Sequence, residues 1–303
     1  MFAFVCPIRH PDTSNDYNEV IKLLELTIAS VCAQTITEDF VFIVVCNETP
    51  TLNIAAEHIA KVIFVPVDFS PPDNNKGTSV TLDAVKFDKG TKIARGLMHL
   101  QSHMPDYVYV IDGDDWININ VLEIIKTYAE SKRRNIDLWY SNTGYIVNFK
   151  NQTYIKKYGV CRYCGSTFIY KYKTLMDVTG LSNIQNTQAS QAEITDQIDE
   201  HILKNILGNH RHQLPFYKAH NLQVKEIPIP AVCWILNTGE NHTGKNGGVF
   251  GLPLTSSFLA SFGLTNIPLT PQKNMIKSLL LTQIDSFKSW VGWRLTNKNA
   301  DKV

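Results

Sequence analysis

The chain has 303 residues, of which 44% are hydrophobic and 19% charged, and its formal net charge is +1. A composition of this kind excludes an intrinsically disordered chain and suits one large α/β domain or two small ones. The near-zero net charge argues against nucleic acid as a partner, and without a run of about 18 apolar residues we predict no transmembrane helix.

The first part of the chain alternates strand and helix patterns. Apolar runs of strand length lie at Phe2–Ile8, Asp39–Asn47, Lys61–Phe69 and Tyr107–Ile111. Helical spacing predicts helices over Asn15–Thr35 and Gly90–His103, with a short one at Ala55–Ala60. Strands separated by helices require crossover connections, so we expect a largely parallel sheet.

The pattern is less regular after Trp116. We expect helices over Asn120–Ser131, Lys173–Leu181 and Ile194–His210, and strands within Ile136–Phe149, Gly165–Tyr172 and Leu222–Leu236. The polar segment Leu181–Glu193 reads as a loop, as does the Gly/Asn-rich segment Asn237–Gly248. No internal repeat or low-complexity segment interrupts this order.

Cysteine spacing and the N-terminus bear on the compartment. Cys161 and Cys164 form the single C-x-x-C of the chain, and no second pair completes the usual zinc pattern. The N-terminus shows neither a basic leader nor an extended apolar segment, so we expect no signal peptide. We therefore expect a cytoplasmic chain with reduced thiols.

Three carboxylates cluster where the fourth strand ends, in the segment PDYVYVIDGDDWININ. Asp112, Asp114 and Asp115 fall within four residues, and like charges this close raise each other's pKa unless a cation or ordered donors compensate them. Ligands of α/β sheets bind at the carboxyl ends of strands, and hard divalent cations take carboxylate oxygens. The residues alone leave two readings open, a metal site and a solvated surface turn.

The order of elements and several segments resemble the GT-A fold glycosyltransferases, most closely glycosyltransferase family 2. The segments are VCPIRHP, TIASVCAQT, FVFIVV, KIARGL and YVYVIDGDDWIN. Asp112-Gly113-Asp114 matches the D-x-D motif of that family. The resemblance implies an α/β fold in which a nucleotide-sugar-binding half (residues 1–125) merges with an acceptor-binding half (126–255), followed by a helical tail (256–303).

The same resemblance implies a metal-dependent, inverting enzyme that moves a sugar from a nucleotide sugar, a UDP-sugar first, to a hydroxyl of a saccharide or lipid-linked saccharide. Mn²⁺ or Mg²⁺ would bind Asp114 directly, with Asp112 on the ribose or a metal-bound water and His242 as a further ligand. Asp115 would support this site, unless it only caps the following helix. A place in bacterial surface polysaccharide synthesis is a further expectation by analogy.

Seven other positions are candidates for the donor site. Arg9 offers a charge-assisted contact to a diphosphate, and Asn47 or Glu48 would replace the Asp with which the family reads the base. Lys89, Lys92 and Arg95 would either bind phosphate or be solvated on the surface of their helix, and for Lys92 we expect solvation. The full set of candidates, with Gly113 of the motif, is Pro7, Arg9, His10, Asn47, Glu48, Lys89 and Arg95. Lys245 would help to close the late loop over the phosphates.

The catalytic base is expected in the segment TDQIDEHILKNIL. Asp199-Glu200 fits the acidic pair of the family with its two members swapped, so we predict Glu200 or Asp199 as the base, with Asp196 as third choice. The alternative for each is a solvated charge on an amphipathic helix.

The C-terminal segment Asn274–Leu295 has an apolar helical stripe beside Trp290, Trp293 and several lysines. Such a helix packs on its own domain or forms a homodimer, and a peripheral contact with the inner face of the membrane is the alternative. Two other functions stay open for the chain. One is a nucleotidyltransferase, although the first strand lacks a Gly-rich sequence after it, and the other is an inactive nucleotide- or sugar-binding protein.

Overall fold

A seven-stranded sheet forms the centre of the computed structural model, which describes residues 1–36, 40–73, 76, 80–132, 135–242, 251–269, 284 and 287–294. The strand order is β10 (Val224–Glu226), β6 (Leu138–Tyr140), β9 (Phe168–Lys171), β4 (Tyr107–Val110), β1 (Phe2–Pro7), β2 (Phe40–Cys46) and β3 (Val62–Pro66). β4, β1, β2 and β3 are parallel, and β9 runs antiparallel to both of its neighbours. The predicted, largely parallel α/β sheet is therefore confirmed.

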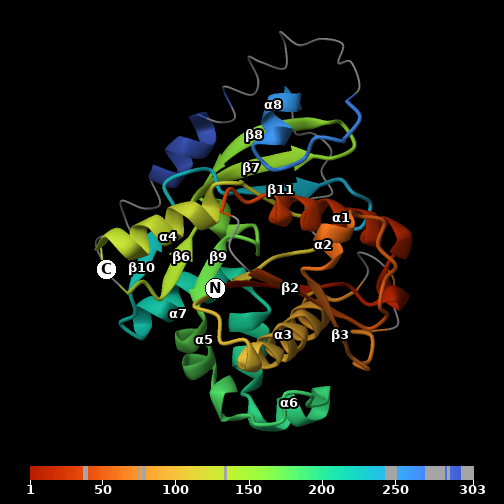
Figure 1. Cartoon of the computed structure of the whole chain (residues 1–303), viewed down its shortest axis with the longest axis vertical. Coiled ribbons are helices and arrows are strands. Elements are labelled where there is room, and N and C mark those ends of the chain that lie inside the picture. The colour runs from red at the N-terminus through yellow and green to blue at the C-terminus, as the bar shows by residue number, and fades with distance from the viewer. Residues whose placement is uncertain are drawn as a thin grey trace.

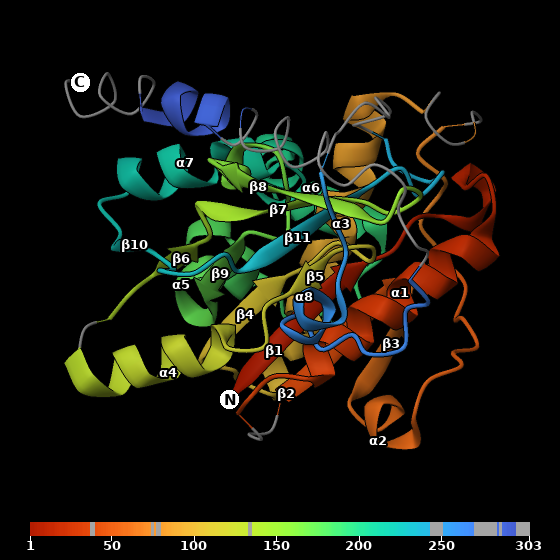
Figure 2. The ribbon, with the colours of Figure 1, turned by 90° about the horizontal axis from the view of Figure 1, so that it is seen from above.

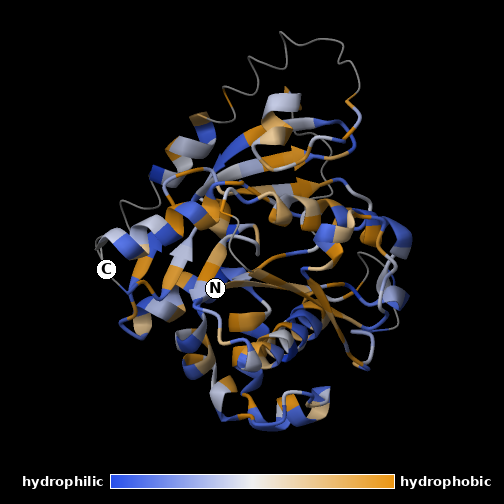
Figure 3. Cartoon of the chain, in the orientation of Figure 1, coloured by the Kyte–Doolittle hydropathy of each residue, from blue (hydrophilic) through white to orange (hydrophobic). Residues whose placement is uncertain are grey.

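Helices cover both faces of this sheet, which explains why its strands are continuous apolar runs. Figure 1 shows α1 (Tyr17–Cys32) and α3 (Leu82–His99) on opposite sides of β1 and β2. Alternate residues of β1 face each side: Val5 belongs to the cluster that contains α3, and Phe4 to the cluster that contains α1 and α4 (Val121–Lys132). The strands accordingly carry the apolar colour in Figure 3.

A second sheet of five strands joins residues from both halves of the chain. Its order is β12 (Leu252–Pro253), β8 (Thr153–Tyr158), β7 (Thr143–Asn148), β11 (Val232–Leu236) and β5 (Trp116–Ile117). The short helix α8 (Ser256–Ala260) lies beside α1 in Figure 2, and Phe258 shares an apolar cluster with Trp116. Both sheets contain strands from before and after residue 125, where we placed the boundary between the two halves. In the central sheet, β6, β9 and β10 from the second half lie beside β1 to β4 from the first.

The structure differs from the predicted elements mainly at their ends. α3 begins at Leu82, eight residues before the predicted start, with Thr81 as its N-cap. The helix expected over 194–210 is interrupted, because Ile198 has extended backbone angles between α6 (Gln191–Gln197) and a π-helical turn, η6 (Ile202–Leu207). β8 was not predicted. The remaining helices are α2 (Ala56–Ile59), α5 (Tyr172–Thr179) and α7 (Gln213–Ala219).

Two glycines bring η6 into backbone contact with α3. A Cβ at Gly90 would lie 2.0 Å from the carbonyl oxygen of Leu203, and one at Gly208 would lie 2.0 Å from that of Lys86. Only glycine permits this approach. The approach fixes the residues that follow η6 against the N-terminal half of α3.

Most of the C-terminal segment expected to be helical lies outside the described residues. Its described part, 287–294, is helical. It contacts β8, since the backbone N–H of Tyr158 donates to Ser289 and the Tyr158 and Trp293 rings lie 6.4 Å apart. Phe287 remains 63% exposed. Within the described residues, none of the helices combines the length and hydropathy that a membrane span requires.

Candidate functional site

A cavity of about 460 Å³ opens where the central parallel strands end. One wall comes from the segment after β1 and from α1 and α3, and the other from the segments before β9, after η6 and after β11. Its floor is the acidic turn Asp112–Asp115. The cavity is lined on the first side by residues that include Pro7, Arg9, Leu23, Asp88 and Lys89, and on the second by Tyr163, Gly165, His210, Arg211, Trp234, Glu240, Asn241 and His242.

The carboxylates of Asp112 and Asp114 have different partners. Asp112 forms an ion pair with Lys89, and its backbone N–H donates to Ser166 Oγ at 2.8 Å. Asp114 accepts a hydrogen bond from Asn241 Nδ2 at 3.1 Å. Both carboxylates line the cavity. A cationic ligand, or an anionic one carried by a cation, would therefore meet negative oxygens here.

Asp115 connects the acidic turn to both sheets. It is 1% exposed, and it accepts hydrogen bonds from Ser166 Oγ at 2.7 Å, from Cys164 Sγ and from the backbone N–H of Ile235. α4 begins only at Val121, so Asp115 does not cap it. Its contacts hold the turn in place between β9 and β11.

Crowding within the acidic turn perturbs the protonation of Asp114 and Asp115. Burial and repulsion by Asp115 and Asp112 raise the pKa of Asp114 well above its usual value, and burial with repulsion by Asp112 raises the pKa of Asp115 to about 7. The charged forms therefore cost stability in the ligand-free chain.

We expect Asp114→Asn to be more stable than the wild type by a margin that grows as the pH rises from about 4 to about 7, because ionisation of the crowded carboxylates costs the wild type stability over that window. His210 and His242, whose lowered pKa values act in the opposite direction over the same window, are present in both proteins and cancel in the difference. Melting temperatures of the two proteins across this range measure the margin, and a margin that shrinks as the pH rises would contradict this expectation.

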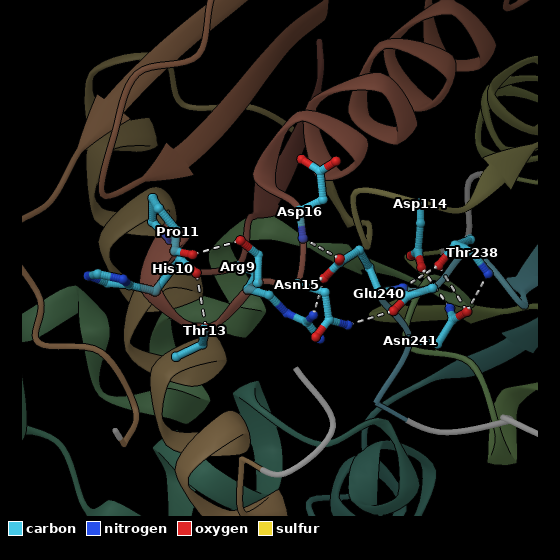
Figure 4. A network of polar contacts seen from close by, with 12 residues as sticks. Arg9, His10, Pro11, Thr13, Asn15, Asp16, Asp114, Thr238, Glu240 and Asn241 are labelled. Carbon is cyan, nitrogen blue, oxygen red and sulfur yellow. Dashed lines mark hydrogen bonds and ion pairs between the residues drawn. The ribbon is translucent and has the colours of Figure 1, made fainter. Parts of the chain in front are cut away.

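Arg9 reaches the cavity but carries a partner of its own. Its guanidinium donates to Glu240 at 2.6 Å, and the two side chains are 12% and 7% exposed. Glu240 also accepts from the backbone N–H groups of Asn15 and Asp16 at the start of α1, as Figure 4 shows. The segment after β11 thereby holds Arg9, the entry to α1 and, through Asn241, the carboxylate of Asp114.

Lys92 is not the solvated surface lysine that we expected. It is fully buried, and its ammonium donates at 2.9 Å to the Ile8 carbonyl and at 2.9 Å to Asp88. Burial lowers the pKa of Lys92 and raises that of Asp88. The ion pair connects α3 to the segment after β1, and both segments contribute to the cavity wall. Asp88 lines the cavity, whereas Lys92 does not.

Two histidines line the cavity. His210 lies 3.1 Å through Nε2 from the carbonyl oxygen of Arg162. A carbonyl only accepts, so Nε2 carries the proton and Nδ1 is left as a proton acceptor. Burial and the nearby charge of Lys89 lower the pKa of His210 to about 4, and burial with Arg9 does the same for His242. Both imidazoles are thus neutral near pH 7.

Several predicted site residues do not line the cavity. Asn47 donates to the Phe69 carbonyl at 2.7 Å, Glu48 is exposed, and His10 caps the 3₁₀ turn Pro11–Thr13. Arg95 is 8% exposed within α3. None of these four residues lines the cavity, so their contact with a donor stays a prediction from the family resemblance.

The predicted bases also lie outside the cavity lining. Glu200 forms an ion pair with Lys204, and Asp199 accepts from the backbone N–H of His201 at 2.6 Å. Both are exposed, as is Asp196. Their catalytic role stays a prediction, and His210 now competes with it. Lys245 lies outside the described residues.

The donor set partly fits a divalent cation. Asp112 and Asp114 supply hard oxygens, and the raised pKa of Asp114 indicates negative charge that a cation would compensate. Among the residues that the structure describes, however, no three His, Cys, Asp or Glu side chains are placed to hold a metal ion. His242 lines the same cavity. A metal bound here would therefore take further ligands from the substrate or from water.

Sequence reasoning missed Glu240, Asn241, His210 and the Asp88–Lys92 pair. Only the last had a local signal, the i,i+4 spacing of opposite charges on one helix. The others have partners that are distant in the chain: Glu240 binds Arg9 across 231 residues, Asn241 binds Asp114 across 127, and His210 contacts Arg162 across 48.

Comparisons with known proteins gave only distant similarities. No protein-family model matches the chain, and no curated protein matches its sequence. Among solved structures, S. aureus TarS 1-349 in complex with UDP is similar with a TM-score of 0.46 and 13% identity, over 78% of this chain and 60% of that one. The same protein in complex with UDP-GlcNAc gives a TM-score of 0.41 and 10% identity, over 86% and 64%.

A cytidylyltransferase from Leptospira borgpetersenii is similar with a TM-score of 0.41 and 11% identity, over 76% of each chain. The chain thus spans about three fifths of the length of TarS 1-349. None of these scores reaches 0.5, so the assignment below depends on the geometry of the cavity.

Proposed function

We propose that this chain is a glycosyltransferase that moves a sugar from a nucleotide-sugar donor, a UDP-sugar first, to a hydroxyl of a saccharide or lipid-linked saccharide. The observation that supports it is the Asp112-Gly113-Asp114 turn, which opens at the carboxyl end of a central parallel strand into a cavity with walls from both halves of the chain. An inverting outcome and a role in bacterial surface polysaccharide synthesis stay predictions from the family resemblance.

The proposed donor lies with its diphosphate against the acidic turn. Asp114 and Asp112 would hold Mn²⁺ or Mg²⁺ there, and such an ion stabilises the charge of the leaving diphosphate as a Lewis acid. Lys89 faces the same place with an ammonium that has three donors, of which Asp112 takes one. Its two other N–H donors would bind phosphate oxygens of the donor.

The proposed base is His210, with Glu200 or Asp199 as the competing assignment. Its Nε2 is held by the Arg162 carbonyl, so Nδ1 is the nitrogen that takes the proton of the acceptor hydroxyl. A bound diphosphate adds negative charge near the imidazole and raises its pKa from the low value that burial imposes.

Two variants distinguish these bases. His210→Ala is expected to lower transfer by about 10²- to 10⁴-fold, the usual contribution of a general base, with donor binding retained. Glu200→Gln should transfer close to the wild-type rate, because Glu200 is exposed and paired with Lys204. Rates with saturating donor measure both, and the opposite ranking would move the assignment back to Glu200.

The donor site is tested by melting-temperature screens. The full chain is heated with UDP-, GDP-, CMP- and dTDP-sugars, each with and without Mn²⁺. A ligand at 100 times its Kd stabilises by about 2.7 kcal/mol, which raises the melting temperature by several degrees. We expect a shift for a UDP-sugar that requires Mn²⁺, and the absence of any shift would remove the main support for the proposal.

The alternatives predict different products. A nucleotidyltransferase would join a nucleoside triphosphate to a sugar phosphate and release diphosphate, whereas an inactive binding protein would give a melting shift without turnover.

We further propose that the described helix 287–294, with Phe287 exposed beside Trp290, contacts a second copy of the chain, with a membrane surface as the alternative. Sedimentation with and without anionic vesicles separates the two.

A further inference from the structure

Two aromatic side chains stand at the cavity on the side away from β1. Tyr163 is 44% exposed, and Trp234 is partly exposed. Their rings lie nearly parallel, at 22°, with centroids 6.1 Å apart. Both line the same cavity as the acidic turn. Apolar ring area that remains open to solvent inside a cavity is a binding surface more often than an accident of packing.

The fold places this aromatic pair next to the acidic turn. Trp234 precedes Ile235, whose backbone N–H donates to Asp115. Tyr163 lies two residues before Gly165, where a Cβ would be 2.7 Å from Asp112 Oδ2 and 2.8 Å from Lys89 Nζ. The pair therefore lies beside the proposed diphosphate site in the same cavity.

Two cationic side chains accompany the aromatic pair. Lys157 places its ammonium 4.5 Å from the centroid of the Tyr163 ring, and Arg211 lines the cavity as an exposed side chain. A ligand that reaches the aromatic pair meets cations beyond it.

From these contacts we propose that Tyr163 and Trp234 form the acceptor subsite, and that the acceptor is a saccharide that carries negative charge. The flat apolar face of a pyranose covers aromatic rings through its C–H groups, which the negative face of a π-system attracts. Its carboxylate or phosphate groups pair with Lys157 and Arg211. The word acceptor rests on the proposed transferase function, whereas the binding of an anionic saccharide does not.

The test is a binding titration with two defined probes, tetragalacturonate, which is anionic, and cellotetraose, which is neutral. Intrinsic tryptophan fluorescence of the full chain reports binding, and the Trp234→Phe variant identifies the part of the signal that arises at this position. We expect tetragalacturonate to bind more tightly than cellotetraose. Raising the NaCl concentration from about 0.05 to about 0.5 M should weaken the binding of tetragalacturonate but not that of cellotetraose, because salt screens exposed charges.

Tyr163→Ala is expected to lower the affinity for tetragalacturonate by about tenfold, because the substitution truncates a central aromatic contact. Phe287→Ala is the matched control, since Phe287 is a more exposed ring on the C-terminal helix, outside the cavity. Melting temperatures confirm that the variants are folded, and the UDP-sugar shift should be unchanged in Tyr163→Ala. Equal binding of both probes, no binding of either, or an unchanged affinity in Tyr163→Ala would overturn the proposal. A saccharide that binds while no nucleotide does would instead refute the transferase function and leave this subsite standing.

Discussion

Asp114→Asn is expected to abolish sugar transfer while the protein stays folded. The carboxylate of Asp114 accepts a hydrogen bond from Asn241 and lines the cavity where the diphosphate is proposed to bind. Its loss removes several kcal/mol of charge stabilisation, so the transfer rate should fall by at least about 10³-fold. Because the replaced carboxylate is repelled by Asp112 and Asp115, the ligand-free variant should melt no lower than the wild type at pH 8.

Two measurements check this prediction. Single-turnover transfer with a UDP-sugar and Mn²⁺ gives the rate, and the melting shift with the same ligands gives donor binding. Asp12→Asn is the control, since this carboxylate is exposed and lies outside the cavity lining. A variant at Asp114 that transfers sugar at the control rate would show that the acidic turn has no catalytic role.

Lys92→Met is expected to give the largest loss of stability of any single change considered. The substitution leaves the carboxylate of Asp88 buried without its cation and removes the donor to the Ile8 carbonyl. Removal of one partner of a buried pair costs about 3–5 kcal/mol. Urea unfolding should therefore show a clearly lower midpoint with the slope unchanged.

The double variant Asp88→Asn/Lys92→Met separates the pair from simple loss of packing. Without the uncompensated carboxylate it should regain much of the stability, because a buried ion pair contributes little in total compared with the cost of breaking it. Lys86→Met is the matched control on the same helix, since Lys86 pairs with the exposed Asp83 and its loss should scarcely move the midpoint. A double variant as unstable as Lys92→Met would mean that the lysine acts through its packing.

The sequence by itself determined the architecture and the position of the acidic turn. Runs such as Phe2–Pro7 are apolar at every position, which is the pattern of a strand covered on both faces, and helical spacing between them requires crossovers. In a parallel sheet the strand ends meet at one edge. The place of Asp112 and Asp114 at the carboxyl edge of the sheet therefore follows from local pattern, whereas the cavity at that edge is known from the tertiary structure.

Only the tertiary structure decided which polar groups meet there. Arg9 and Glu240 are 231 residues apart and pair because the segment after β11 crosses the start of α1. Lys92 has the sequence context of a surface lysine, yet it is buried because α3 packs its side against the segment after β1. The aromatic pair likewise comes from separate segments, since Tyr163 follows the 3₁₀ turn Val160–Arg162 and Trp234 belongs to β11. Local spacing encodes a residue's strand or helix and its face, whereas its partner across the cavity depends on long-range packing that periodicity does not encode.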